Sequence, residues 1–359
     1  MQMITNPTAK LVVPGVALAA AFTTIIAATA ANLTAFETVG PTVPFAYPWR
    51  LAEPTAIARL TAWAGYLLHN IIAWAIIYRA RREKPAYGTE LRWFNRAMIA
   101  VNLAAIGLHF AQSQLYYDGL AADVHEATAL GSVALMLMIV ILFETPRRGL
   151  IFGKKFKFKA GFMQAARQYH GYLFSWAIIY TFWYHPTEGT WGHLMGFFYM
   201  FMLFVQSTLI FNRAHVNKYW TFTLEFFVLI HGVVVALLQG NALWPMFTFG
   251  FGSLVVLTQM YGLGLNTLSQ RLLVALFVVG AVGPYAVTGS MSQIHEIIRI
   301  PLPDYMVIFF RYGSYLLVTR VAAQFQQPAS PAWVIRRPQL RQPLSPTASF
   351  RREVDQREK

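Results

Sequence analysis

Residues 124–159, VHEATALGSVALMLMIVILFETPRRGLIFGKKFKFK, contain the two patterns that decide the fold. The first twenty residues form an apolar block whose only ionisable side chains, one His and one Glu, stand near its start. A helix of about 20 apolar residues crosses a hydrocarbon core of about 30 Å. The following loop, residues 144–164, holds six Lys and Arg against one Glu. An apolar span that runs into a basic loop is typical of a membrane helix that ends on the cytoplasmic side.

Similar apolar blocks recur along the whole chain. The composition agrees, because 56% of the 359 residues are hydrophobic and 12% are charged, whereas soluble domains carry about 25% charged residues. The sequence therefore predicts an all-α, polytopic integral membrane helical bundle over residues 1–323 and excludes an ordinary cytosolic enzyme. We expect about ten transmembrane helices, at roughly 11–31, 58–78, 93–116, 124–143, 165–184, 192–211, 219–238, 244–264, 270–288 and 304–322.

Lys and Arg predict the orientation of these spans. If the N-terminus is cytoplasmic, the segments on the inner side hold 25 of the 29 Lys and Arg residues. Cytoplasmic loops are enriched in these residues, so we expect both termini in the cytoplasm and the protein in the cell (cytoplasmic) membrane. The net charge of +14 then faces the anionic lipid of the inner leaflet, and we expect no nucleic-acid partner.

Two inner segments carry further signals. Residues 324–359 are rich in Pro, Ser, Gln and Arg, which predicts a disordered, basic cytoplasmic tail. Residues 154–159, KKFKFK, alternate Lys with Phe. This alternation predicts an interfacial strip with its rings among the lipid headgroups and its ammonium groups on phosphate.

A short internal repeat suggests a duplication. Phe94-Asn95-Arg96-Ala97 recurs as Phe211-Asn212-Arg213-Ala214, and each copy stands near the inner start of a span. The two spans are four helices apart and therefore run in the same direction. A parallel duplication of about 58–150 and 165–265 would explain the match, as in some transporters and redox proteins. A chance match between two Arg-flanked membrane boundaries would explain it equally well.

Histidine and carboxylate side chains gather on the predicted outer side. Ionisable groups at membrane depth usually have a function, so we predict one site built from these residues. The candidate acid–base residues are Glu126, Glu188 and Glu296. The candidate metal ligands are His109, His125, His185, His193, His231 and His295. We expect at least three of the six His to place ring nitrogens within about 8 Å of one point, the reach that a metal site needs before it tightens.

The cofactor is left open by the sequence. The chain has no Cys, which excludes thiolate metal sites and a Cys nucleophile. Imidazole and carboxylate suit a divalent metal or non-haem iron, but no His-Glu-x-x-His motif is present. Haem b is the other option, because His109 and His231 stand at one depth on different helices, as a bis-His haem requires.

A second group of polar residues lies nearer the middle of the predicted membrane. His69 and Asn70 are at the centre of one span. Glu225 is the only carboxylate well inside a span, and it must be protonated, paired with a cation or in contact with water. Arg213 and Lys218 are near enough in depth to pair with it.

Three functions are compatible with these patterns. The first is a multi-pass membrane enzyme that acts on a lipid, an isoprenoid or another hydrophobic small molecule near the outer leaflet, through metal-dependent or general acid–base chemistry. The second is a secondary transporter with a midplane site near His69, Asn70 and Glu225. The third is a non-catalytic subunit of a membrane complex, with or without haem, which packs on membrane-protein partners. Only the enzyme requires the outer His to converge.

Overall fold

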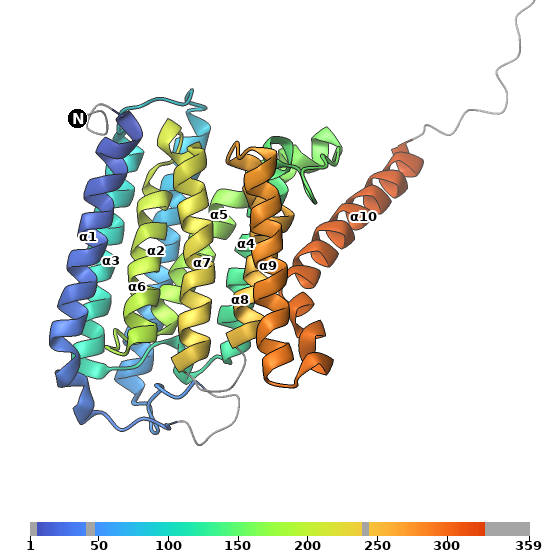
Figure 1. Cartoon of the computed structure of the whole chain (residues 1–359). Coiled ribbons are helices and arrows are strands. Elements are labelled where there is room, and N and C mark those ends of the chain that lie inside the picture. Colours follow the sequence, from blue (N-terminus) through green and yellow to red (C-terminus); the bar gives the residue numbers. More distant parts are fainter. Residues whose placement is uncertain (1–5, 41–46, 239–243, 327–359) are drawn as a thin grey trace, which may run out of the picture. The chain divides into compact units, whose positions relative to one another are not determined.

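The chain folds into helices. The computed structural model describes residues 6–40, 47–238 and 244–326, and every regular element in these ranges is helical. The all-α prediction is confirmed, and one α-helix lies on each of the ten predicted spans (Figure 1). The α-helices are α1 (Pro7–Thr29), α2 (Ala56–Arg82), α3 (Trp93–Tyr116), α4 (Glu126–Arg148), α5 (Ala160–Tyr184), α6 (Trp191–Thr208), α7 (Lys218–Leu238), α8 (Trp244–Leu257), α9 (Thr267–Val287) and α10 (Pro301–Gln326).

Seven helical segments in the described ranges are long and apolar enough to cross a membrane. Two of them include a short 3₁₀ helix, η2 (Ala30–Ala35) after α1 and η6 (Met291–Arg299) before α10. The other five are α2, α3, α4, α7 and α9. This is the architecture expected of a multi-pass membrane protein. Ten crossings and cytoplasmic termini stay predictions.

The span predicted at 244–264 is divided in the structure. Helix α8 has 14 residues, about 21 Å at 1.5 Å per residue, which is shorter than the hydrocarbon core. The chain then turns through the 3₁₀ helix η5 (Gln259–Gly262). The amide of Phe152 donates to the carbonyl of Leu257 at 2.7 Å, so a loop far away in sequence binds the end of α8. Hydropathy along one segment contains no information about such a contact.

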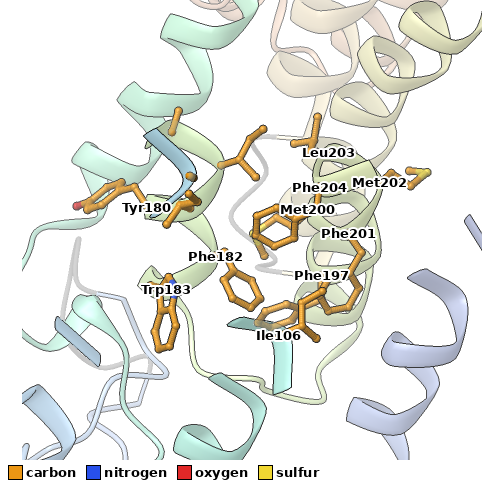
Figure 2. Packing of buried hydrophobic residues seen from close by; sticks show 14 of the residues in the cluster. Ile106, Tyr180, Phe182, Trp183, Phe197, Met200, Phe201, Met202, Leu203 and Phe204 are labelled. Carbon is orange, nitrogen blue, oxygen red and sulfur yellow. The ribbon is translucent and has the colours of Figure 1, made fainter. Parts of the chain in front are cut away.

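Helices α5 and α6 lie in the middle of the helical packing. Helix α5 contacts α2, α4 and α6, while α6 contacts α1, α3, α5 and α7. Two helices can pack closely around a large ring only if the facing helix has a small residue at that point. Gly65 of α2 meets this need, because a Cβ there would lie 2.1 Å from the ring of Trp183. The buried aromatic side chains of α5 and α6 fill the space between the helices, as Figure 2 shows for Phe182, Trp183, Phe197, Phe201 and Phe204.

The Lys–Phe strip packs on protein. The ring centroid of Phe158 lies 5.1 Å from that of Tyr312 in α10, and the centroid of Phe156 lies 5.9 Å from the same ring. Helix α10 therefore covers part of the Phe158 ring, while Phe156 is 40% exposed. The position of these rings among lipid headgroups stays a prediction.

The two repeat segments contact each other. The side-chain amide of Asn95 donates to the carbonyl of Thr208 at 2.7 Å, just before the second copy at 211–214. In return, the Asn of that second copy donates to the carbonyl of Glu90 at 3.3 Å, just before the first copy at 94–97. The first copy opens α3, whereas the second lies in a turn that leads into the 3₁₀ helix η4 (Arg213–Val216). The duplication itself stays a prediction.

The chain divides into two units after Tyr315. In the second unit the described part is the end of α10, which continues to Gln326. Residues 324–326, predicted as the start of the tail, are therefore helical. The rest of the predicted tail lies outside the described residues.

Candidate functional site

Four of the six predicted His come together at one end of the helices. We call His109, His185, His193 and His231 the His cluster. The rings of His185 and His193 have centroids 5.6 Å apart, and Nε2 of His109 lies 2.8 Å from the carbonyl oxygen of His185. His231 lies against Gly196, one turn after His193, where a Cβ would be 3.1 Å from its ring. The cluster joins α3, α6 and α7 to the chain directly after α5.

Local sequence positions two of these imidazoles. Pro186 disfavours helical geometry at the residue before it, and His185 is accordingly extended, with φ −98° and ψ 137°, so that α5 ends there. Thr190 is the N-cap residue of α6, yet its hydroxyl makes no capping bond to the helix backbone. Instead, Thr190 Oγ1 lies 2.6 Å from Nδ1 of His193. An N-cap hydrogen bond usually stabilises a helix by about 1 kcal/mol. The Thr190 hydroxyl orients the imidazole instead, and α6 lacks this stabilisation.

Tyr47, a residue that no sequence motif indicates, completes the arrangement. Tyr47 is buried, with 4% of its surface exposed, and its hydroxyl is hydrogen-bonded to Nε2 of His193. The indole of Trp49 packs on the same imidazole, with ring centroids 4.7 Å apart. Tyr and Trp are common at both membrane–water interfaces without a specific function. A functional Tyr or Trp at such an interface therefore does not stand out in the sequence. The available signal was Pro48 between Tyr47 and Trp49, because a Pro-rich loop holds its side chains in place.

The resulting site is a chain of three groups, Thr190, His193 and Tyr47. A neutral imidazole donates from one nitrogen and accepts at the other, so it can transfer a proton between the two hydroxyls. Burial, and then neighbouring Tyr and Glu side chains including Glu188 and Glu126, raise the pKa of Tyr47 well above its ordinary value. Burial, followed by the other three imidazoles of the cluster, lowers the pKa of His185 well below its ordinary value. Tyr47 is therefore a phenol and the adjacent His185 a neutral imidazole at physiological pH.

The remaining predicted site residues lie elsewhere or play local roles. His125 is exposed and caps α4, where its Nδ1 accepts from the amide of Ala127 at 3.1 Å. His295 is exposed in η6, with Nδ1 2.7 Å from the carbonyl of Ser292. Glu296 pairs with a residue one turn away, Arg299, at 3.3 Å. His125, His295 and Glu296 were predicted with the His cluster because they have the same depth along their helices. Depth does not specify which side of the helical bundle a residue lies on.

The geometry does not favour a metal. In the described ranges, no group of three or more His, Asp or Glu side chains is arranged to hold a metal ion. The nitrogens of His193 are directed at two hydroxyls, and Nε2 of His109 at a carbonyl. The metal-binding prediction is thus not supported. Haem b does not fit at His109 either, because Phe182 and Trp183 pack on its ring with centroids 4.7 and 4.5 Å away.

Buried polar atoms without partners are concentrated beside the His cluster. Among the described residues, Nδ1 of His185 and of His231, Oγ1 of Thr187, Oη of Tyr117 and Oδ2 of Asp118 have no hydrogen-bond partner. Buried polar atoms in folded proteins are almost always hydrogen-bonded to protein, water or a ligand, so these atoms are available to bind water or a substrate. Tyr117 also has a positive φ of 68°, a strained conformation of the kind that gathers at functional sites.

A glycine allows the loop that carries Asp118 to reach α5. A Cβ at Gly119 would lie 2.5 Å from the carbonyl oxygen of Tyr184, and backbone atoms cannot move aside. Asp118 is fully buried, and its Oδ1 accepts from the amide of Gly119 at 3.0 Å. Burial raises the pKa of Asp118 to about 7, so its carboxyl group is largely protonated below neutral pH.

This pKa predicts a pH dependence of stability. A carboxyl whose pKa is raised on folding stabilises the protein below its unfolded pKa of about 4, and this contribution is lost as the pH rises through about 7. At about 1.4 kcal/mol per pKa unit, the effect is a few kcal/mol. We expect Asp118→Asn to remove this fall in stability between about pH 4 and 7. Thermal unfolding of both proteins in detergent across this range measures the difference, and parallel curves would contradict the prediction.

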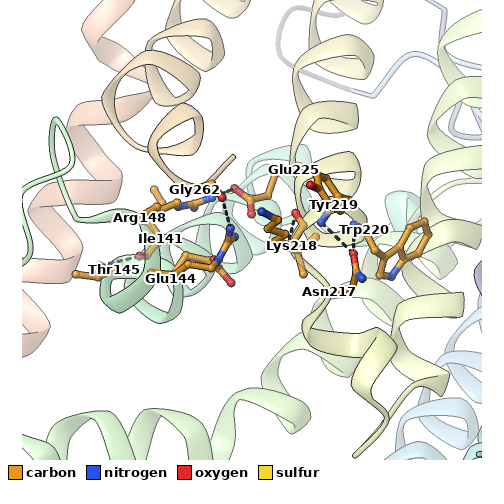
Figure 3. Close-up of polar contacts among 12 residues, drawn as sticks. Ile141, Glu144, Thr145, Arg148, Asn217, Lys218, Tyr219, Trp220, Glu225 and Gly262 are labelled. Carbon is orange, nitrogen blue, oxygen red and sulfur yellow. Dashed lines mark hydrogen bonds and ion pairs between the residues drawn. The ribbon is translucent and has the colours of Figure 1, made fainter. Parts of the chain in front are cut away.

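The polar residues predicted near the membrane centre belong to separate networks. His69 of α2 bonds Asn102 at 3.1 Å through Nε2 and accepts from Trp183 at 3.4 Å through Nδ1. Glu225 of α7 instead pairs with Arg148 at the end of α4, with 2.7 Å between Oε2 and Nη1 (Figure 3). The partner of Glu225 is therefore Arg148, and not Arg213 or Lys218, which were predicted from their depth. Residues 77 positions apart form the pair, which no local pattern indicates.

The fold and the site together define a multi-helix protein that has, within its described residues, seven segments long and apolar enough to span a membrane and a buried hydroxyl–imidazole site at one end of the helices. No protein-family model, curated protein or solved structure matches this chain.

Proposed function

We propose that this protein is a multi-pass enzyme of the cell membrane. It acts by general acid–base catalysis on a lipid, an isoprenoid or another hydrophobic small molecule near the outer leaflet. The observation that carries the proposal is the hydrogen-bonded chain of Thr190, His193 and Tyr47. A base that lies between a hydroxyl and an orienting third group is the arrangement that activates hydroxyls in many enzymes.

Each group has a role that follows from its surroundings. Tyr47 is a phenol at rest, because its raised pKa keeps it protonated, and it donates to Nε2 of His193. When a substrate hydroxyl gives its proton to Oη of Tyr47, the phenolic proton passes to Nε2, and the resulting imidazolium donates through Nδ1 to Oγ1 of Thr190, which keeps the ring in one orientation. The same proton returns along this path to the product when the step is complete. His185 packs edge-on against Tyr47, with ring centroids 5.0 Å apart, and limits the phenol to one direction. Glu188 and Glu126 are near enough to raise the pKa of Tyr47 and so favour its phenol form.

The surroundings favour an uncharged substrate group. Aromatic rings of Trp49, Tyr184 and Phe182 contact the imidazoles of the site. A site built of neutral imidazole and phenol groups would not repay the cost of desolvating a charged ligand. A hydroxyl, carbonyl or double bond on an apolar molecule would lose little solvation there. The division of Lys and Arg, 25 of 29 on the other side, supports placing this end at the outer leaflet.

A comparison of membrane lipids tests the proposal. The wild type, Tyr47→Phe, His193→Gln and the control His125→Gln are expressed in one host, and total lipids are followed by mass spectrometry. We expect the wild type and the control to convert a membrane lipid or isoprenoid. The two site variants should do so about 10²–10⁴-fold more slowly, the usual contribution of a general acid or base.

Thermal unfolding in detergent shows that each variant is folded. Conversion by Tyr47→Phe at the wild-type rate would refute the role of the phenol. An unchanged lipid profile with the folded wild type would refute the enzyme and favour the non-catalytic subunit.

A further inference from the structure

A second site lies at the opposite end of the helices, and it is independent of the proposed reaction. A groove of about 490 Å³ runs between the end of α2 and the start of α5. Its lining residues on α5 recur every three or four positions, which places them on one face of that helix. The groove is lined by Arg81, Ala160, Met163, Gln164, Arg167 and Gln168.

The groove is positively charged. Arg81 of α2 reaches across to α5, where its guanidinium bonds the carbonyls of Arg167 and Gln168. Ion pairs among the described residues involve other arginines, so neither Arg81 nor Arg167 has a carboxylate partner there. Tyr87, His170 and Tyr172 are titratable neighbours of these two arginines. Helix α5 begins at Ala160 without a side-chain cap, which adds the positive end of its dipole.

The groove also stands beside apolar surface. Arg81 follows the predicted span 58–78, and Arg167 stands at the start of the span 165–184, the depth at which lipid phosphates lie. On the same two helices, large aromatic side chains are exposed: Trp74 by 41% and Tyr169 by 61%. A soluble phosphate would make no use of these rings, whereas the acyl chains of a lipid would lie along them.

We propose that this groove binds the phosphate headgroup of one anionic phospholipid of the inner leaflet. Two guanidiniums from different helices suit a phosphate, because each presents a planar pair of donors. Gln164 and Gln168 supply neutral donors to the remaining headgroup oxygens. The bound lipid would join α2 to α5 at this end, and basic pockets between membrane helices are known to hold anionic headgroups.

Native mass spectrometry of the full-length protein in detergent tests the proposal. The protein is titrated with phosphatidylglycerol, with phosphatidylcholine as the neutral-headgroup comparison. Arg81→Gln/Arg167→Gln is compared with Arg79→Gln/Arg82→Gln, which removes the same charge at the end of α2 outside the groove. We expect one tightly bound phosphatidylglycerol, weakened about tenfold or more in the groove variant and less than about threefold in the control.

The outcomes separate the alternatives. Equal weakening in both double variants would assign the binding to overall charge and overturn the site. Displacement of phosphatidylglycerol by an equal concentration of inorganic phosphate would assign the groove to free phosphate and overturn the lipid. If the double groove variant does not fold, the single Arg167→Gln replaces it, because the Arg167 side chain is exposed. Unchanged lipid binding in the folded groove variant would also refute the proposal.

Discussion

Replacing Glu225 by Leu is expected to destabilise the protein by about 3–5 kcal/mol, the cost of leaving one member of a buried ion pair without its partner. The side chains of Arg148 and Glu225 are 1% and 5% exposed, and their charged atoms lie 2.7 Å apart. Nε and Nη2 of Arg148 have no other partner among the described residues. Without Glu225, the guanidinium would keep its charge in an apolar region, because Arg does not deprotonate in proteins.

A matched set of variants separates the lost pair from general disruption. Unfolding in detergent is measured for Glu225→Leu, for Glu225→Leu/Arg148→Met and for Glu144→Gln. The double variant should recover most of the loss, because an apolar pair of similar volume replaces the ion pair. Glu144 pairs with the more exposed Arg147, so its replacement should cost less than about 1 kcal/mol. Wild-type stability of Glu225→Leu would show that the pair does not form.

Replacing Trp183 by Ala is expected to cost about 3–5 kcal/mol, as for other large buried aromatic side chains. Trp183 is 1% exposed and fills the space that Gly65 leaves open on α2. The substitution opens a cavity there and also removes the indole donor to Nδ1 of His69. Because the indole supports the ring of His109 at 4.5 Å, the His cluster should lose part of its packing.

The control for this prediction is Trp191→Ala. Trp191 begins α6 only eight positions later but is 71% exposed, so its loss should change stability by less than about 1 kcal/mol. Both variants are unfolded thermally in the same detergent. A loss below about 1 kcal/mol for Trp183→Ala would mean that the neighbouring rings collapse into the space, and would contradict the prediction that a cavity remains there.

Much of the fold follows from the sequence alone. The apolar blocks predicted ten helices, and the span placed at 93–116 has the bounds of α3. Hydropathy succeeds because each membrane helix satisfies its own backbone, so local composition is sufficient. It is less informative for α8, where the amide of Phe152 binds the carbonyl of Leu257 at the helix end.

The composition and depth of the site were predictable, but which of the six His belong to it was not. The depth of each residue along its helix places all six His at the same end of the helices. It therefore does not separate the four cluster members from His125 and His295. Depth is a property of one helix, whereas position around the bundle depends on which helices pack together.

Tertiary structure alone decided the chemistry of that end. In the folded chain, Tyr47 of a Pro-rich loop is hydrogen-bonded to His193. The N-cap residue of α6, Thr190, is hydrogen-bonded to the other nitrogen of the same imidazole. Tertiary structure also paired Glu225 with Arg148 across 77 residues. Hydrogen bonds of this kind depend on distances between segments that are remote in the chain, and periodicity and composition carry no record of those distances. The sequence determined that the chain forms apolar helices with a basic side, and the packing determined which polar groups meet.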